Sequence, residues 1–113
     1  MLIHTLSKRL DIFLASPEVE IVKQGIEDDE GMFFIQSGEC SVVVQDKIGL
    51  ESGNKLVRLL YKGDHFGEIS LLYGCARSAT VFPNNYTTLA KLSSNDFKDI
   101  SGKYSNFLRH LKD

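Results

Sequence analysis

The sequence predicts an α+β fold that is mainly β: an eight-stranded antiparallel β-roll or jelly roll with flanking terminal helices and one short internal helix. Two observations predict it. Short segments rich in β-branched and aromatic residues recur along the chain, separated by turns that contain Gly, Asn or Pro. Helical patterns occur only near the two ends and in one short internal run. This order of elements favours an antiparallel sheet that closes on itself between helices.

The composition is that of a globular protein and argues against two function classes. The 113 residues suit a single domain, residues 1–113. The formal net charge of −2 argues against a nucleic-acid partner bound through a basic face. No apolar run approaches the roughly 20 residues that span a bilayer, and charged side chains interrupt the first residues, unlike a secretory signal. We therefore expect a cytoplasmic location, with membrane contact only through a larger parent protein.

The elements follow in order along the chain. An N-terminal helix is predicted over residues 1–10, because Leu6 and Leu10 share one face. The β-roll is predicted over residues 11–92. Its strand-like segments include residues 12–15, 19–25, 32–38, 39–46, 55–61, 78–83 and 86–92. Residues 26–31 contain an acidic run that is typical of a solvated turn.

C-terminal helices are predicted over residues 93–113. Ser93 or Ser94 caps the first, Asp96 lies in its first turn against the helix dipole, and Gly102 is its expected stop. A second amphipathic segment follows it.

Motifs for catalysis, metal binding or disulfide formation are missing from the sequence. Cys40 and Cys75 form no CxxC motif and are expected to be reduced packing residues. The three histidines show no metal-ligand spacing, which disfavours a metal- or sugar-binding cupin on a similar β-roll. There is no P-loop and no nucleophile motif. The sequence therefore predicts neither an enzyme nor a bound cofactor.

One stretch, GDHFGEISLLYGCARSATV at residues 63–81, combines Gly67, Glu68 and Arg77 in a way that stability alone does not require. Gly67 would let a ligand approach the backbone at the start of a helical turn or two, and Gly74 supplies a left-handed exit. The first backbone N–H groups of such a turn can hold an anion, and the guanidinium of Arg77 suits a phosphate. The carboxylate of Glu68 would repel a phosphate, so it needs another partner on the ligand. A sugar hydroxyl that donates a hydrogen bond to it is the natural candidate. The alternative is a solvated Glu68–Arg77 ion pair.

Residues 66–81, FGEISLLYGCARSATV, resemble the phosphate-binding cassette of cyclic nucleotide-binding domains, as found in kinase regulatory subunits and cyclic-nucleotide-gated channels. The segment IVKQGIEDDEGMFFIQSGECSVVV resembles the entry to the β-roll of that family, and the resemblance covers roughly residues 1–105. It implies that Glu68 binds the ribose 2′-hydroxyl and that Arg77 binds the cyclic phosphate. The ligand-binding residues that it implies are Phe66, Gly67, Glu68, Ile69, Ser70, Arg77, Ser78 and Ala79.

The chain departs from the family pattern at two positions, and the second leaves the choice between cAMP and cGMP open. Many members have proline before the arginine, where this chain has Ala76. The next position after the arginine is often alanine in cAMP sites and threonine in cGMP sites, and here it is Ser78. The family also closes the base side with a lid from its last helix. We expect that lid to be truncated here, leaving the base side open to solvent.

The resemblance implies a regulatory sensor that binds cAMP or cGMP and transmits binding through movement of its terminal helices. Its effector, a channel pore or a kinase, lies outside this chain, and an oligomer is possible through the parent protein. The element LAKLSSNDFKDI favours the channel branch of the family over kinase regulatory subunits. The alternatives are the regulatory domain of a cyclic-nucleotide-dependent protein kinase, or a ligand-free β-roll that binds protein.

Overall fold

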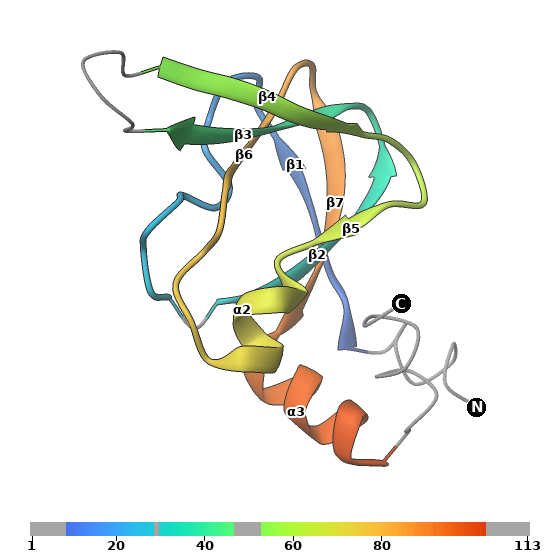
Figure 1. Cartoon of the computed structure of the whole chain (residues 1–113). Helices are drawn as coiled ribbons and strands as arrows, with labels where there is room; N and C mark the ends of the chain where they lie inside the picture. Colours follow the sequence, from blue (N-terminus) through green and yellow to red (C-terminus); the bar gives the residue numbers. More distant parts are fainter. Residues whose placement is uncertain (1–8, 29, 47–52, 104–113) are drawn as a thin grey trace.

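The computed structural model describes residues 9–28, 30–46 and 53–103, and within them the predicted mainly β fold is confirmed (Figure 1). The described elements follow the order β1 (Asp11–Ala15), β2 (Gly31–Ser37), β3 (Cys40–Asp46), β4 (Gly53–Leu60), β5 (His65–Phe66), α2 (Glu68–Tyr73), β6 (Thr80–Pro83), β7 (Thr87–Ser93) and α3 (Ser94–Lys103). The predicted N-terminal helix and the final amphipathic segment with its lid lie almost entirely outside the described residues. None of the described helices is long and apolar enough to span a membrane.

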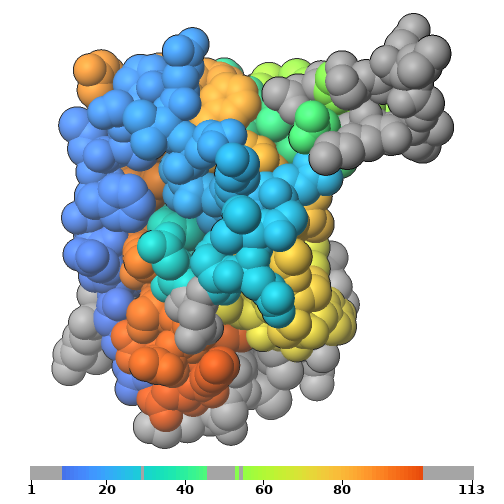
Figure 2. Space-filling view, turned by 90° about the vertical axis from the view of Figure 1, so that its left-hand side faces the viewer, coloured from blue at the N-terminus to red at the C-terminus, as the bar shows by residue number. Residues whose placement is uncertain are grey.

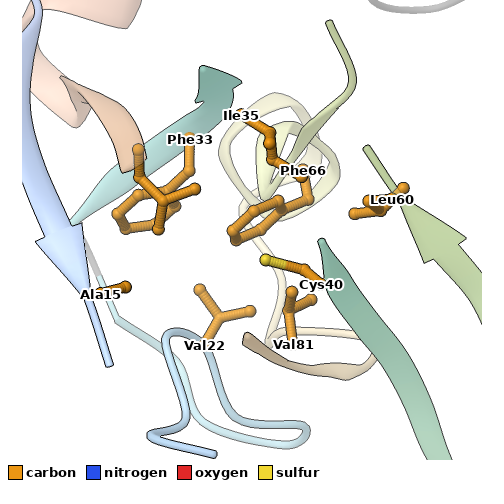
Figure 3. Close-up of a cluster of buried hydrophobic side chains, with 9 residues drawn as sticks. Ala15, Val22, Phe33, Ile35, Cys40, Leu60, Phe66 and Val81 are labelled. Atoms are coloured by element: carbon orange, nitrogen blue, oxygen red, sulfur yellow. The ribbon is translucent and has the colours of Figure 1, made fainter. Parts of the chain in front are cut away.

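The strands form two antiparallel sheets that face each other. One sheet has the order β1-β7-β2-β5 and the other the order β4-β3-β6. Side chains from both sheets meet in the interior of the roll, as Figure 3 shows. This cluster consists of Ala15, Val22, Phe33, Ile35, Cys40, Leu60, Phe66, Val81 and Leu89. Its aromatic centre is the stacked pair Phe33 and Phe66, with ring centroids 5.2 Å apart.

Strand β2 serves two apolar clusters because its side chains alternate between faces. Phe33 and Ile35 point into the roll. Met32 points to the opposite face, where it packs with Leu92, Phe97 and Ile100 in a second cluster beneath the helices. Partly buried side chains complete this second cluster, among them Leu10, Phe34, Leu71 and Leu72. Both α2 and α3 are thus fastened to the same end of one sheet (Figure 1).

The segment before β2 departs from the prediction. Residues 19–25 were expected to form a strand, but they contribute only the single bridge Val22↔Val81. Gly25 has a φ of +83°, outside the range of a regular strand. The segment instead runs beside the chain that follows α2, with Gly25 N–H donating to the Arg77 carbonyl and Arg77 N–H donating to the Ile26 carbonyl. Figure 2 shows it in blue to cyan, next to the yellow cassette.

The structure also differs from the sequence prediction at β5, at the end of α3 and at Cys75. Strand β5 was not predicted as a strand, since two residues give too short a pattern to detect. Helix α3 begins at Ser94, and the side chain of Ser93 accepts from the Asp96 N–H as a cap, but Gly102 does not stop the helix, which reaches Lys103. Cys40 is a buried packing residue as expected, whereas Cys75 is exposed.

Candidate functional site

The sequence-predicted ligand residues come together around one cavity of about 170 Å³. All eight line it: Phe66, Gly67, Glu68, Ile69, Ser70, Arg77, Ser78 and Ala79. The remaining wall consists of Val22, Val42, Arg58, Leu60, His65 and Val81. The cavity therefore lies between the cassette and the roll, and its wall contains both apolar and charged side chains.

Gly67 is where strand β5 turns into helix α2, and only glycine fits there. Its φ is +94°, in the left-handed region that side-chain-bearing residues rarely adopt. A Cβ at this position would lie 2.8 Å from Nη1 of Arg77 and 3.2 Å from the Gly31 carbonyl oxygen. Gly67 thus lets the arginine side chain approach the backbone. At the other end of α2, Gly74 adopts φ +62° and donates its N–H to the Ser70 carbonyl, which confirms the predicted left-handed exit.

Arg77 is the most deeply buried cation of the described residues that line this cavity, with 3% of its surface exposed. Its Nε donates to Oδ2 of Asp28 at 3.0 Å, and its Nη2 donates to Oδ1 of the same carboxylate. Nη1 donates to the Gly67 carbonyl at 2.8 Å, and Nη2 also donates to the Gly31 carbonyl at 2.9 Å. A guanidinium has five N–H hydrogens, and these contacts use four of them. The second hydrogen on Nη1 has no acceptor among the described residues.

The sequence suggested that Asp28 belongs to a solvated turn. In the structure it instead positions the guanidinium of Arg77. The hydrogen bonds from Arg77 hold the pKa of Asp28 below its ordinary value, against the opposing effect of burial. A buried cation is costly unless it is paired and hydrogen-bonded, and Asp28 with the two carbonyls meets that requirement. The guanidinium is thus fixed in the cavity wall before any ligand arrives.

Glu68, the first residue of α2, has a different partner. Its Oε1 lies 3.2 Å from Nδ1 of His65, three residues earlier on strand β5. Glu68 raises the pKa of His65, mainly through this side-chain contact, while burial opposes the shift. Because Glu68 contacts His65 and Arg77 contacts Asp28, the two cassette residues do not form the solvated ion pair with each other that the sequence left open.

The other predicted residues divide between cavity wall and core. Phe66 is 6% exposed and stacks on Phe33, so it belongs mainly to the core. The hydroxyl of Ser70 donates to the Gly67 carbonyl at 3.2 Å and braces the first turn of α2. Ile69 is about half exposed at the edge of the cavity.

Sequence reasoning missed three polar contributors. Asp28 is 49 residues upstream of Arg77 and carries no local signal for that contact. His65 could have been found, because a histidine and a glutamate three residues apart across a turn are natural partners. Arg58, on strand β4, lines the cavity with an exposed side chain whose Nη2 lies 3.9 Å from the Asp64 carboxylate. The described residues contain no cluster of His, Cys, Asp and Glu side chains that could hold a metal ion.

With this geometry in view, comparison with known proteins identifies the family. The family model for the cyclic nucleotide-binding domain matches residues 15–104. The chain belongs to this family. A cAMP-dependent protein kinase regulatory subunit from Debaryomyces hansenii is 34% identical over 90 residues, which are 80% of this chain and 18% of that protein. A cGMP-dependent protein kinase from Toxoplasma gondii is 30% identical over 92 residues, 81% of this chain and 8% of that protein.

Solved structures agree with the fold and point to the same branch. A mutant regulatory subunit of a cAMP-independent protein kinase A from Trypanosoma brucei, bound to cAMP in its A site, superposes with a TM-score of 0.79 at 28% identity. The match covers 94% of this chain and 38% of that one. These relatives are kinases and kinase regulatory subunits, so the comparisons favour the kinase alternative over the channel preference drawn from the sequence. The LSSNDF element that suggested a channel is simply the capped start of α3.

Proposed function

We propose that this domain binds cAMP or cGMP in the cavity between the cassette and the roll, as the sensor of a cyclic-nucleotide-dependent protein kinase. The observation that carries the proposal is the buried guanidinium of Arg77, held by Asp28 beside a carboxylate that it does not pair with. A fixed cation suits a cyclic phosphate and a separate carboxylate suits a ribose hydroxyl. These two groups occur together on a cyclic nucleotide.

In this proposal, each ligand group meets a prepared partner. The phosphate takes the remaining hydrogen on Nη1 of Arg77, so the bonds to Asp28 and the two carbonyls need not break. The ribose 2′-hydroxyl donates to Glu68. A cavity of about 170 Å³ is smaller than the ~300–1,000 Å³ that encloses a typical ligand. Phosphate and ribose therefore fill it, and the base extends toward its edge, where Arg58 and Ser78 are the polar side chains.

Binding would reach the rest of the protein through the two helices. Leu71 and Leu72 of α2 pack on the cluster that contains Phe97 and Ile100 of α3. A ligand that favours one placement of the cassette would therefore bias the placement of α3, by a shift of population between two states. We propose that the effector is the catalytic part of a protein kinase in the cytoplasm. The chain spans less than a third of the length of the curated relatives it matches. In this proposal the kinase catalytic domain therefore lies elsewhere in a longer polypeptide or in a partner protein.

Stabilisation against unfolding tests the proposal. With free nucleotide at 100 times its Kd, the free energy of unfolding should rise by about 2.7 kcal/mol. Denaturant unfolding with cAMP, cGMP and the linear 5′-monophosphates measures it. Stabilisation by at least one cyclic nucleotide and weaker stabilisation by its linear counterpart support the proposal. A folded protein that neither cyclic nucleotide stabilises would be the ligand-free interaction module, and the proposal would be wrong.

A further inference from the structure

Strand β5 carries a histidine, His65, for which the nucleotide site described above has no role. His65 lines the cavity together with Glu68 and Arg77. Strand β5 pairs with β2 in the register Phe34↔His65, and the chain then turns at Gly67 into α2. This turn brings the imidazole of His65 back over the first residue of the helix. Its ring meets that of Phe34 edge to face, with centroids 6.1 Å apart, which limits the positions that the ring can adopt.

The imidazole has one polar neighbour that matters. Nδ1 of His65 is buried and has no aligned hydrogen bond, but it lies 3.2 Å from Oε1 of Glu68. The side chains of Glu68 and His65 are 13% and 32% exposed, so solvent screens this pair in part. The structure assigns no partner to Oε2 of Glu68 among the described residues, and a carboxylate can accept at both oxygens.

We propose that His65 is a positioning residue for Glu68: its imidazolium holds Oε1 and offsets the charge that would repel the ligand phosphate, leaving Oε2 for the ribose hydroxyl. The inference rests on the proposed nucleotide function. A carboxylate and a phosphate in one small cavity repel each other, and a cation next to the carboxylate reduces that repulsion. His65 is the cation that the geometry provides on the Glu68 side, since Arg77 is already engaged by Asp28.

Three charged side chains of the described residues act on His65. Glu68 faces it from α2, Asp64 from the preceding turn and Arg58 from β4, while β2 presents the apolar ring of Phe34. The contact with Glu68 raises the pKa of His65 above its ordinary value of 6.5.

The sign of the pH dependence follows from this. If the protonated form binds the nucleotide better, binding raises the pKa of His65 further. The gain in affinity is then complete below the pKa in the free protein and is lost as the pH rises through the higher pKa in the complex. For a partly exposed ion pair, the affinity should fall about two- to fivefold between about pH 6 and about pH 9.

The test is a calorimetric titration of cAMP and cGMP, and of their 2′-deoxy forms, across this pH range. His65→Asn keeps a donor near the place of Nδ1 but cannot titrate, and His65→Phe keeps a ring but has no donor. We expect the pH dependence in the wild type alone. His65→Asn should bind the ribose ligand with a pH-independent affinity, and His65→Phe should bind it about two- to fivefold more weakly than the wild type at low pH. The loss should be smaller for the 2′-deoxy ligand.

Two different failures can be told apart. If the wild type binds a cyclic nucleotide but its affinity does not change with pH, or the change persists in His65→Asn, then His65 does not position Glu68 through its charge. Should His65→Phe fail to fold, the wild type and His65→Asn decide the question alone. If the folded wild type binds no cyclic nucleotide at any pH, the proposed function is overturned, and this inference with it.

Discussion

Two buried regions of the described chain differ in character: the apolar cluster beneath α3 and the charged network of the cassette. Helix α3 places Phe97 and Ile100 against Met32 and Leu92, and all four side chains are at most 2% exposed. Beyond α2, the cassette encloses Arg77, almost equally buried but charged. Burial of apolar side chains stabilises the fold by itself. Burial of an arginine carries a desolvation cost, which hydrogen-bond and charge partners must offset. We propose that the apolar cluster mainly stabilises the fold, while the charged network of the cassette serves the proposed binding of the nucleotide.

Removing the arginine should have the largest effect on nucleotide binding. Arg77→Ala should weaken nucleotide binding by about 2–5 kcal/mol, because the phosphate loses a fixed, desolvated cation. It should also lower the free energy of unfolding, since Asp28 and two carbonyls lose their donor. Titration and denaturant unfolding measure the two losses. Lys62→Ala removes an exposed cation outside the cavity and is the matched control. Unchanged affinity in a folded Arg77→Ala protein would rule out the cassette as the site.

The apolar cluster should respond in the opposite way. Ile100→Ala should lower the free energy of unfolding by about 2–5 kcal/mol, through lost burial and the space left behind. The affinity of the protein that remains folded should change less than about twofold, well under 1.4 kcal/mol. Denaturant unfolding and titration of the same sample measure both. A large loss of affinity without a loss of stability would mean that α3 contributes directly to the binding site, and the division between the two regions would not hold.

Breaking the support of the arginine should have an intermediate effect. Asp28→Asn should lower the free energy of unfolding by about 1–3 kcal/mol at neutral pH, since it leaves a buried cation with weaker acceptors. The pKa of Asp28 is lowered by Arg77, so its contribution is complete above the unfolded value and disappears as the pH falls through the lower folded value. Unfolding curves of wild type and Asp28→Asn should therefore converge in acid. Curves that stay equally separated at every pH would contradict this role.

Replacing the carboxylate should have a smaller effect on binding than removing the arginine. Glu68→Gln should weaken binding of the ribose nucleotide by about 1–2 kcal/mol, because a neutral amide oxygen is a poorer acceptor. Binding of the 2′-deoxy nucleotide should hardly change. The comparison of the two ligands is the measurement, and it separates the hydroxyl contact from any general damage to the site. Equal losses for both ligands would show that Glu68 does not accept from the ribose.

The sequence predicted the parts of the fold and site that depend on neighbouring residues. The cassette could be predicted because Gly67, Glu68 and Arg77 lie within eleven residues and form one strand–helix–loop unit. The contact between Asp28 and Arg77, which supports that unit, could not be predicted. Asp28 reaches Arg77 only because the segment before β2 folds back beside the cassette. The same fold-back explains the missing strand at residues 19–25, whose alternating pattern resembles a strand but whose backbone pairs at one bridge.

A crystal structure of the chain with a saturating cyclic nucleotide tests the central claim most directly. We predict the cyclic phosphate within hydrogen-bond distance of Nη1 of Arg77 and the ribose 2′-hydroxyl on Glu68, with the contacts between Arg77 and Asp28 still in place. The nucleotide should lie in the cavity that the cassette shares with Val22 and Val42. A nucleotide bound elsewhere, or one in this cavity whose phosphate does not contact Arg77, would contradict the account.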